Sequence, residues 1–162
     1  MKKGFIFRRA KPADLKNIQR LSRKLFRFED RHFDQTLDQN WPFGSGKKFF
    51  KKKIAGRNHF AEVAETKNVM IGYLAGGIYK GIPWRQRGVY AELDNMFIES
   101  RFRGRGVGEK LVKDFLDWCR QKKVDFVQVT ASSKNKNAIG FYRRTGFRNY
   151  ALVLEMERPG RN

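Results

Sequence analysis

A glycine-rich turn flanked by arginines is the stretch of this sequence that points most clearly to chemistry. It reads Arg103-Gly104-Arg105-Gly106-Val107-Gly108, with glycines at alternate positions. Without side chains in the way, main-chain N–H groups of such a turn converge on one anion, and a helix that starts there adds the positive end of its dipole. The turn therefore predicts a binding site for a phosphate or diphosphate group.

The spacing of the turn separates it from two common phosphate-binding motifs. The P-loop needs Lys and then Ser or Thr after its last glycine, whereas Gly108 is followed by Glu109-Lys110-Leu111. The dinucleotide fingerprint G-x-G-x-x-G fails because Glu109 stands at its third glycine position. A third pattern, R-x-x-G-x-G, fits at Arg103, Gly106 and Gly108. A glycine-rich surface turn without a ligand is the alternative.

A second motif follows one predicted helix and one predicted strand later. It reads Asn135-x-x-Ala138-Ile139-x-Phe141-Tyr142-x-x-x-Gly146-Phe147. Together, and at this separation, the two motifs resemble the GNAT superfamily of N-acetyltransferases, at motif level over about 89–156. The resemblance implies an α+β fold of three layers, in which helices flank a mixed, mostly antiparallel central sheet. It also implies a single GNAT domain over residues 1–162.

The resemblance implies acetyl-coenzyme A (acetyl-CoA) as the acetyl donor. Main-chain N–H groups of the glycine turn would hold its diphosphate, and the strand before the turn would hydrogen-bond its pantetheine arm where two strands of the sheet splay apart. The residues implied in cofactor binding are Met96, Phe97, Ile98, Arg103, Gly104, Arg105, Gly106, Val107, Gly108 and Asn135. For Asn135, a helix N-cap is an equally open interpretation.

Two catalytic roles are also implied. Tyr142 matches the family tyrosine that protonates the departing thiolate, with a structural tyrosine beside Phe141 as the alternative. The base would be one of two carboxylates on the strand before the turn, Glu92 or Asp94, acting directly or through water. We prefer Glu92 because its longer side chain reaches further, although a salt bridge to an arginine is the alternative for each.

The resemblance thus implies an N-acetyltransferase that moves an acetyl group from acetyl-CoA to a primary amine, either a small cationic amine or a protein amine, by direct transfer in a ternary complex. The competing hypothesis is a GNAT-fold module that binds nucleic acid or the ribosome through a basic surface, since the formal net charge is +20. Tyr142 and a strand carboxylate favour the enzyme, because a binding module needs neither. The resemblance also admits a homodimer, since GNAT proteins often pair through a sheet edge or the C-terminal strand.

Four acidic residues lie close together in this basic chain. They are Glu29, Asp30, Asp34 and Asp38. Such a group could receive a cationic substrate, but we favour helix caps and pairs with neighbouring arginines.

The composition argues against several other classes of protein. One cysteine and two histidines rule out a disulfide framework and argue against a zinc site of three or four nitrogen and sulfur ligands, so no metal is expected. The longest weakly polar stretch, 70–79, is too short for a membrane span, and no signal peptide is evident. We expect a cytoplasmic protein without a membrane partner, and a packed rather than nucleophilic Cys119.

The hydrophobic pattern predicts the elements that would position these residues. Strands are expected at 5–9, 59–65, 69–79, 89–98, 124–130 and 152–156, and helices at 13–28, 47–55, 107–122 and 137–145. A turn at 66–68 would close a hairpin. The phase of alternation changes near Asp94-Asn95-Met96, which suits a β-bulge.

Overall fold

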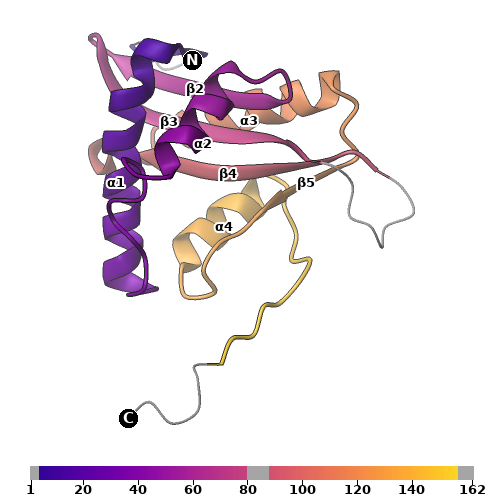
Figure 1. The fold of residues 1–162 in the computed structure, drawn as a ribbon. Coiled ribbons are helices and arrows are strands. Elements are labelled where there is room, and N and C mark those ends of the chain that lie inside the picture. Colours follow the sequence, from indigo (N-terminus) through magenta and orange to yellow (C-terminus); the bar gives the residue numbers. More distant parts are fainter. Residues whose placement is uncertain (1–3, 80–87, 157–162) are drawn as a thin grey trace.

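The structure is a computed structural model that describes residues 4–79 and 88–156, and it shows a five-stranded sheet with helices on both faces (Figure 1). The strands are β1 (Ile6–Arg9), β2 (His59–Thr66), β3 (Val69–Tyr79), β4 (Tyr90–Ile98) and β5 (Phe126–Val129). The helices are α1 (Leu15–His32), α2 (Gly46–Ala55), α3 (Val107–Gln121) and α4 (Lys136–Arg144), with short 3-10 turns η1 (Pro12–Asp14) and η2 (Ser100–Phe102).

The order of the strands in the sheet follows the chain, β1-β2-β3-β4-β5. The first four strands are antiparallel neighbours, whereas β4 and β5 are parallel. A parallel pair needs a long crossover connection, and α3 makes that crossover over one face of the sheet. The predicted mixed, mostly antiparallel sheet is confirmed.

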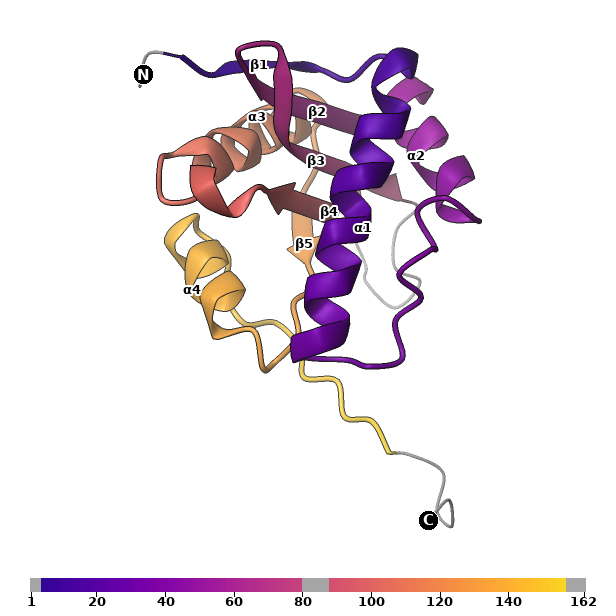
Figure 2. The ribbon, with the colours of Figure 1, turned by 90° about the vertical axis from the view of Figure 1, so that its left-hand side faces the viewer.

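Each face of the sheet has its own hydrophobic core, so the fold has three layers. On one face α1 and α2 pack through Ile18, Leu21 and Phe50 onto apolar residues of β2 and β3 (Figure 2). On the other face α3 packs through Leu111 and Phe115. The stripe of apolar residues that predicted each helix is the face that the helix buries.

Most expected elements are present with shifted ends. The first helix extends one turn beyond the expected 13–28, and β5 is shorter than the expected 124–130. The hairpin turn is confirmed, because Lys67 and Asn68 between β2 and β3 have positive φ angles of 48° and 62°.

The expected closing strand at 152–156 was wrong. This segment forms no strand, and Leu152, Val153 and Leu154 are at least 75% exposed. It leads away from the sheet, as the yellow end of the chain shows (Figure 2). An apolar run becomes a strand only when it meets a sheet edge that pairs with its backbone, and the sequence pattern alone does not report that meeting.

The expected β-bulge is confirmed in the middle of β4. Ala75 of β3 pairs with Asn95 and Gly76 pairs with Leu93, so Asp94 is the extra residue. Because side chains alternate along a strand, one added residue exchanges the two faces. Leu93 before the bulge and Met96 after it both pack toward α3 for this reason.

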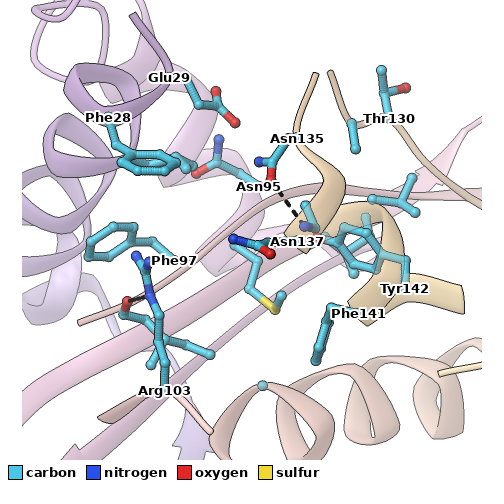
Figure 3. Close-up of a pocket in the computed structure, with 18 of the residues that line it drawn as sticks. Phe28, Glu29, Asn95, Phe97, Arg103, Thr130, Asn135, Asn137, Phe141 and Tyr142 are labelled. Carbon is cyan, nitrogen blue, oxygen red and sulfur yellow. Dashed lines mark hydrogen bonds between the residues drawn. The ribbon is translucent and has the colours of Figure 1, made fainter. Parts of the chain in front are cut away.

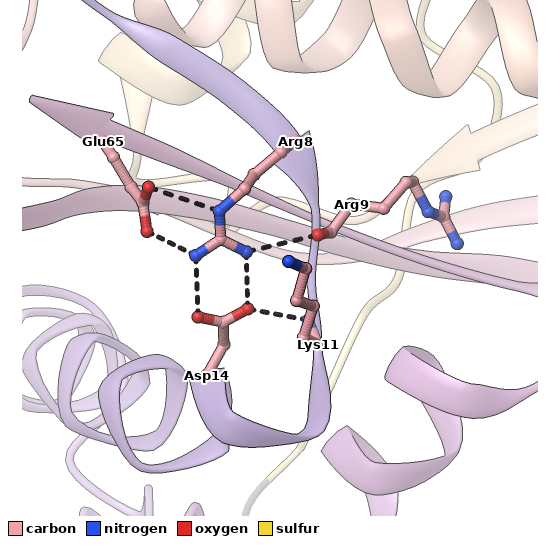
Figure 4. A network of polar contacts seen from close by, with 5 residues as sticks. All are labelled: Arg8, Arg9, Lys11, Asp14 and Glu65. Carbon is pink, nitrogen blue, oxygen red and sulfur yellow. Dashed lines mark hydrogen bonds and ion pairs between the residues drawn. The ribbon is translucent and has the colours of Figure 1, made fainter. Parts of the chain in front are cut away.

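A network around Arg8 fixes the N-terminal corner of the fold (Figure 4). The guanidinium of Arg8 donates to both carboxylate oxygens of Asp14, at 2.7 and 2.9 Å, and also pairs with Glu65 of β2. Asp14 further accepts a hydrogen bond from the backbone N–H of Lys11 at 2.7 Å. Its hydrogen bonds to Arg8 hold the pKa of Asp14 below its ordinary value. Asp14 therefore joins β1 to the start of α1, as expected for an acidic residue in a first helical turn.

Candidate active site

A cavity of about 620 Å³ opens where β4 and β5 diverge. The parallel pairing ends at Leu93 with Val129, although β4 continues to Ile98 and, among residues 4–79 and 88–156, has only β3 beside it there. Residues after the bulge form one wall of the cavity, and Thr130 and Ala131 form the facing wall. The end of α1, the start of α3 and α4 complete it (Figure 3). The splayed strands implied by the family resemblance are thus present.

The open edge of β4 offers hydrogen-bonding groups to the cavity. Successive residues of a strand direct their N–H and C=O groups to opposite edges. Met96, Phe97 and Ile98 pair with β3 on one edge only, and all three line the cavity. The other edge is therefore available to an extended ligand lying alongside β4, which is the arrangement expected for a pantetheine arm.

The glycine turn lies at one end of this cavity and leads into α3. Gly104 and Gly106 have positive φ angles of 66° and 83°, a conformation that residues with side chains rarely adopt. Val107, at the first position of α3, has a buried side chain and leaves only its backbone to the turn. The first N–H groups of a helix lack acceptors within it, so they can bind an anion.

Gly108 has a packing role that the spacing of the motif did not reveal. A Cβ atom there would lie 3.0 Å from Ile98 Cδ1 and 3.2 Å from the ring of Phe141. This glycine therefore allows α3 to approach both β4 and α4, in addition to any contact with a phosphate.

The two arginines of the turn differ in their placement. Arg103 lines the cavity, donates from Nε to the carbonyl of Ile98 at 2.9 Å, and lies 5.4 Å from the centre of the Phe97 ring (Figure 3). Arg105 lies 5.8 Å from the centre of the Phe102 ring and is not part of the cavity lining. Of these two arginines, Arg103 is the one that brings its charge into the cavity.

Tyr142 lines the cavity from α4, as both interpretations of the sequence allow. Its ring packs edge-on against Phe141 and Phe147, with ring centres 5.2 and 5.7 Å away. Burial, with a smaller contribution from the Glu29 carboxylate, raises the pKa of the phenol well above its ordinary value. The phenol therefore keeps its proton at neutral pH and can donate it.

The two candidate bases occupy different positions. Asp94 lines the cavity, whereas Glu92 does not and instead accepts a hydrogen bond from the Tyr90 hydroxyl at 2.9 Å. Asp94 is held by two partners: Lys53 Nζ donates to Oδ2 at 2.5 Å, and the Tyr79 hydroxyl donates to Oδ1 at 2.6 Å. The bulge that makes Asp94 the extra residue thus places its carboxylate at the edge of the cavity.

Lys53 is a site-supporting residue that the sequence analysis missed. In the basic helix 47–55, inward-facing Phe50 and Ile54 predict that most of the lysines lie in water, yet the Lys53 side chain is only 2% exposed. Its Nζ donates to both Asp94 and the Tyr79 hydroxyl, at 2.5 and 2.6 Å. Burial lowers the pKa of Lys53, and the neighbouring Asp94 opposes that shift. The helical position of Lys53, three residues after the inward-facing Phe50, was the only signal for this placement.

Asn135 and Cys119 have the structural roles that the sequence allowed. The Asn135 side chain accepts a hydrogen bond from the Ala138 N–H at 3.0 Å, which caps α4, and the residue also lines the cavity. Cys119 is buried in the core beneath α3, and burial raises the pKa of its thiol to about 12. In the part of the chain that the structure describes, no group of three or more His, Cys, Asp or Glu residues could hold a metal ion.

The comparison with known families identifies this arrangement. The model of the acetyltransferase (GNAT) family matches residues 15–147, which include the splayed strands, the glycine turn and Tyr142. The chain belongs to the GNAT family. The resemblance read from the two motifs is therefore confirmed, and the match extends it to α1, α2 and the hairpin, which lie before the two motifs.

Two GNAT relatives are similar to the chain in sequence. An uncharacterised N-acetyltransferase of Methanocaldococcus jannaschii is 28% identical over 120 residues, which cover 68% of this chain and 53% of that protein. The chain thus matches about half the length of that relative. A thialysine N-epsilon-acetyltransferase of Sus scrofa is 25% identical over 148 residues, which cover 89% of this chain and 84% of that protein.

A solved GNAT structure supports the fold and the family's cofactor. The aminoglycoside N-acetyltransferase AAC(6')-Iy, in complex with CoA, superposes with a TM-score of 0.75 at 17% identity, over 98% of this chain and 99% of that one. Acetyl-CoA as the donor accords with this family, and the residues present here fit it. They supply an unpaired strand edge, free helix-terminal N–H groups and a cavity beside both. In the described ranges, 4–79 and 88–156, no helix is long and apolar enough to cross a bilayer.

Proposed function

We propose that this chain transfers the acetyl group of acetyl-CoA directly to a primary amine, and that residues 1–162 act as one GNAT domain. The observation that carries the proposal is the unpaired edge of β4. It leads from the glycine turn into the cavity that Tyr142 and Asp94 also line. The names of two similar proteins, a thialysine and an aminoglycoside acetyltransferase, support an amine acceptor.

The binding role falls mainly to the backbone. The N–H groups at the start of α3 would hold the diphosphate, because no carbonyl of the helix itself accepts their hydrogen bonds. The edge of Met96 and Phe97 would hold the pantetheine arm, and an N–H there would polarise the thioester carbonyl. The thioester itself supplies an activated acyl group with a thiolate as leaving group.

Tyr142 would act as the general acid. Its phenol faces the cavity and its raised pKa keeps the proton in place until the thiolate forms. The proton then passes from the hydroxyl to sulfur, and the phenolate regains a proton from solvent.

Asp94 is the better-placed of the two candidate bases. Its carboxylate lies at the cavity edge, whereas Glu92 is engaged with Tyr90 outside the cavity lining. Hydrogen bonds from Lys53 and Tyr79 occupy one lone pair on each oxygen of Asp94, which leaves another on each to accept a proton from the ammonium of the acceptor, directly or through water. We propose Asp94 as the base, with Lys53 as its positioning residue.

A panel of primary amines incubated with acetyl-CoA, with detection of released thiol, tests the proposed reaction. We expect amine-dependent thiol release by the wild-type chain and release that is slower by about 100-fold by Tyr142→Phe at matched concentration. Absence of thiol release with every amine, together with salt-sensitive RNA binding, would instead support a binding module.

We also propose that the chain forms a homodimer through its C-terminal segment. Leu152, Val153 and Leu154 are at least 75% exposed, and β5 stands at the end of the sheet. A second copy of the chain carries the same apolar segment and the same sheet edge, so each copy could cover the apolar segment of the other in a two-fold dimer. Light scattering of the full chain and of a chain ending at Asn149 should give a dimer and a monomer, and two monomers would refute this.

A further inference from the structure

The four clustered acidic residues of the α1 region do not behave alike in the structure. Asp30 accepts a hydrogen bond from Gln39 Nε2 at 2.7 Å, and Asp34 accepts one from the Thr36 N–H at 3.0 Å. Asp38 accepts one from the Asn40 N–H at 2.8 Å. These three carboxylates therefore stabilise the segment that follows α1, whereas the sequence analysis favoured helix caps and pairs with neighbouring arginines.

Glu29 is the exception. It lies in the last turns of α1, is partly buried, and lines the cavity with its carboxylate turned toward Asn95 and Asn135 (Figure 3). Among the described residues, its carboxylate accepts no hydrogen bond and forms no ion pair. Burial raises the pKa of Glu29, and its charge in turn raises the pKa values of Tyr73 and Tyr142. A partly buried carboxylate in electrostatic reach of both tyrosines thus faces the cavity without an ion pair to any described residue, although Arg103, Lys134, Lys136 and Arg144 line the same cavity.

The other candidate acid at this wall is already compensated. The charge of Asp94 is paired with the buried ammonium of Lys53. Taking a carboxylate out of water without a partner costs free energy, so an uncompensated one in a cavity is stabilised by a cationic ligand.

We propose that Glu29 binds a second ammonium group of the acceptor, which makes the preferred acceptor a diamine or a similar small molecule with two cationic nitrogens. The nitrogen that attacks must lose its charge, whereas a carboxylate stabilises the charged form. Glu29 therefore suits the nitrogen that stays protonated, while Asp94 and Tyr142 serve the one that reacts. This assignment rests on the proposed amine acetyltransferase.

Calorimetric titration in the presence of CoA tests the assignment, with 1,4-diaminobutane and 1-aminobutane as matched probes. Glu29→Gln keeps the shape of the side chain and removes its charge. We expect it to weaken binding of the diamine by about tenfold, as expected for loss of a charge-assisted contact, and to leave binding of the monoamine within about twofold. Asp117→Asn, which removes a carboxylate charge on α3 outside the cavity lining, should leave both affinities unchanged.

The outcomes separate this assignment from the proposed function. Equal affinity of the wild-type chain for the two amines, or equal diamine affinity in Glu29→Gln, overturns the role of Glu29 whether or not acetyl transfer occurs. Selective loss of diamine binding in Glu29→Gln supports the role even if no thiol is released from acetyl-CoA, and in that case only the proposed transfer fails. A parallel rise in the diamine KM at unchanged kcat would support both.

Discussion

The sheet has a closed part and an open part, and they meet within a single strand. In the closed part, β1 to β3 and the first residues of β4 are paired, and Tyr90 to Leu93 have neighbours on both edges. In the open part, Asn95 to Ile98 have a neighbour on one edge and a cavity on the other. The same backbone is thus paired on both edges before Asp94 and leaves hydrogen-bonding groups facing the cavity after it.

The difference shows how the bulge separates the two tasks. In the closed part, burial of apolar side chains against α3 and α1 gains free energy on both faces. In the open part, β4 has no hydrogen bonds to β5, so its polar backbone groups on that edge remain available to a ligand. Changes in the closed part should therefore alter stability with little effect on ligand binding, and changes in the open part should do the reverse.

The largest effect is expected at the junction, where Lys53 holds Asp94. Lys53→Met should lower the free energy of unfolding by about 3–5 kcal/mol, because it leaves a buried carboxylate without its cation. Urea unfolding of the two chains measures this. Lys52→Met, which replaces an exposed lysine of the same helix, should stay within about 0.5 kcal/mol of the wild type. Equal losses in both variants would show that the junction does not depend on the Lys53 pair.

Tyr142 lies on α4 and faces the cavity beside the open part, so Tyr142→Phe should lower the reaction rate and leave the stability of the closed part unchanged. Without the phenol proton we expect kcat to fall about 100-fold, the lower range for loss of general acid catalysis, because water can replace part of its role. The KM for acetyl-CoA should change less than about twofold, since binding rests on backbone groups. Steady-state thiol release with the best amine of the panel measures both constants, and an unchanged kcat would remove Tyr142 as the acid.

Gly106→Val should also affect the open part and spare the closed one. A φ angle of 83° is strained for a residue with a Cβ, so the turn should change shape and the affinity for CoA should fall about tenfold. Calorimetric titration with CoA measures this, and thermal unfolding monitors the fold. Gly140→Ala in α4, where an added Cβ meets no atom closer than 3.5 Å and φ is not positive, should keep wild-type affinity. Unchanged CoA affinity in Gly106→Val would argue against the diphosphate site.

The smallest effect on ligand binding is expected for Glu62, which lies in the closed part and faces α3. Burial, reinforced by the neighbouring Asp114, raises the pKa of Glu62 from 4.5 to about 7. The folded chain therefore holds a proton that the unfolded chain releases, and stability should fall by at most about 3 kcal/mol as pH rises from about 4.5 to about 7. Glu62→Gln should flatten this slope in urea unfolding across that pH range, without changing CoA affinity. A slope that persists in the variant would assign it to other groups.

Much of the closed part could be predicted from the sequence, because its signals are local. The apolar stripe Val107, Leu111 and Phe115 predicts α3, and the phase change near Asp94 predicts the bulge. The closing strand was predicted wrongly at 152–156. The apolar run can be read from the local sequence, but whether it meets a sheet edge depends on residues far away in the chain.

The site was less accessible to sequence reasoning, because it depends on contacts between distant residues. The glycine turn and Tyr142 belong to motifs with fixed spacing, so their joint placement at one cavity was foreseeable. Glu29 and Lys53 belong to runs of similar charged residues. Only tertiary packing distinguishes the one that faces the cavity, or the one that is buried, from its neighbours in the run.

The burial of Cys119 has a practical consequence for measuring the enzyme. It is the only cysteine of the chain, it lies in the core, and burial raises the pKa of its thiol to about 12. A disulfide reagent that reports free CoA reacts with thiolates, so the folded protein should contribute almost no background colour. In urea the same reagent would react with Cys119 of unfolded molecules and so report the unfolded fraction. One reagent could therefore measure both turnover and unfolding.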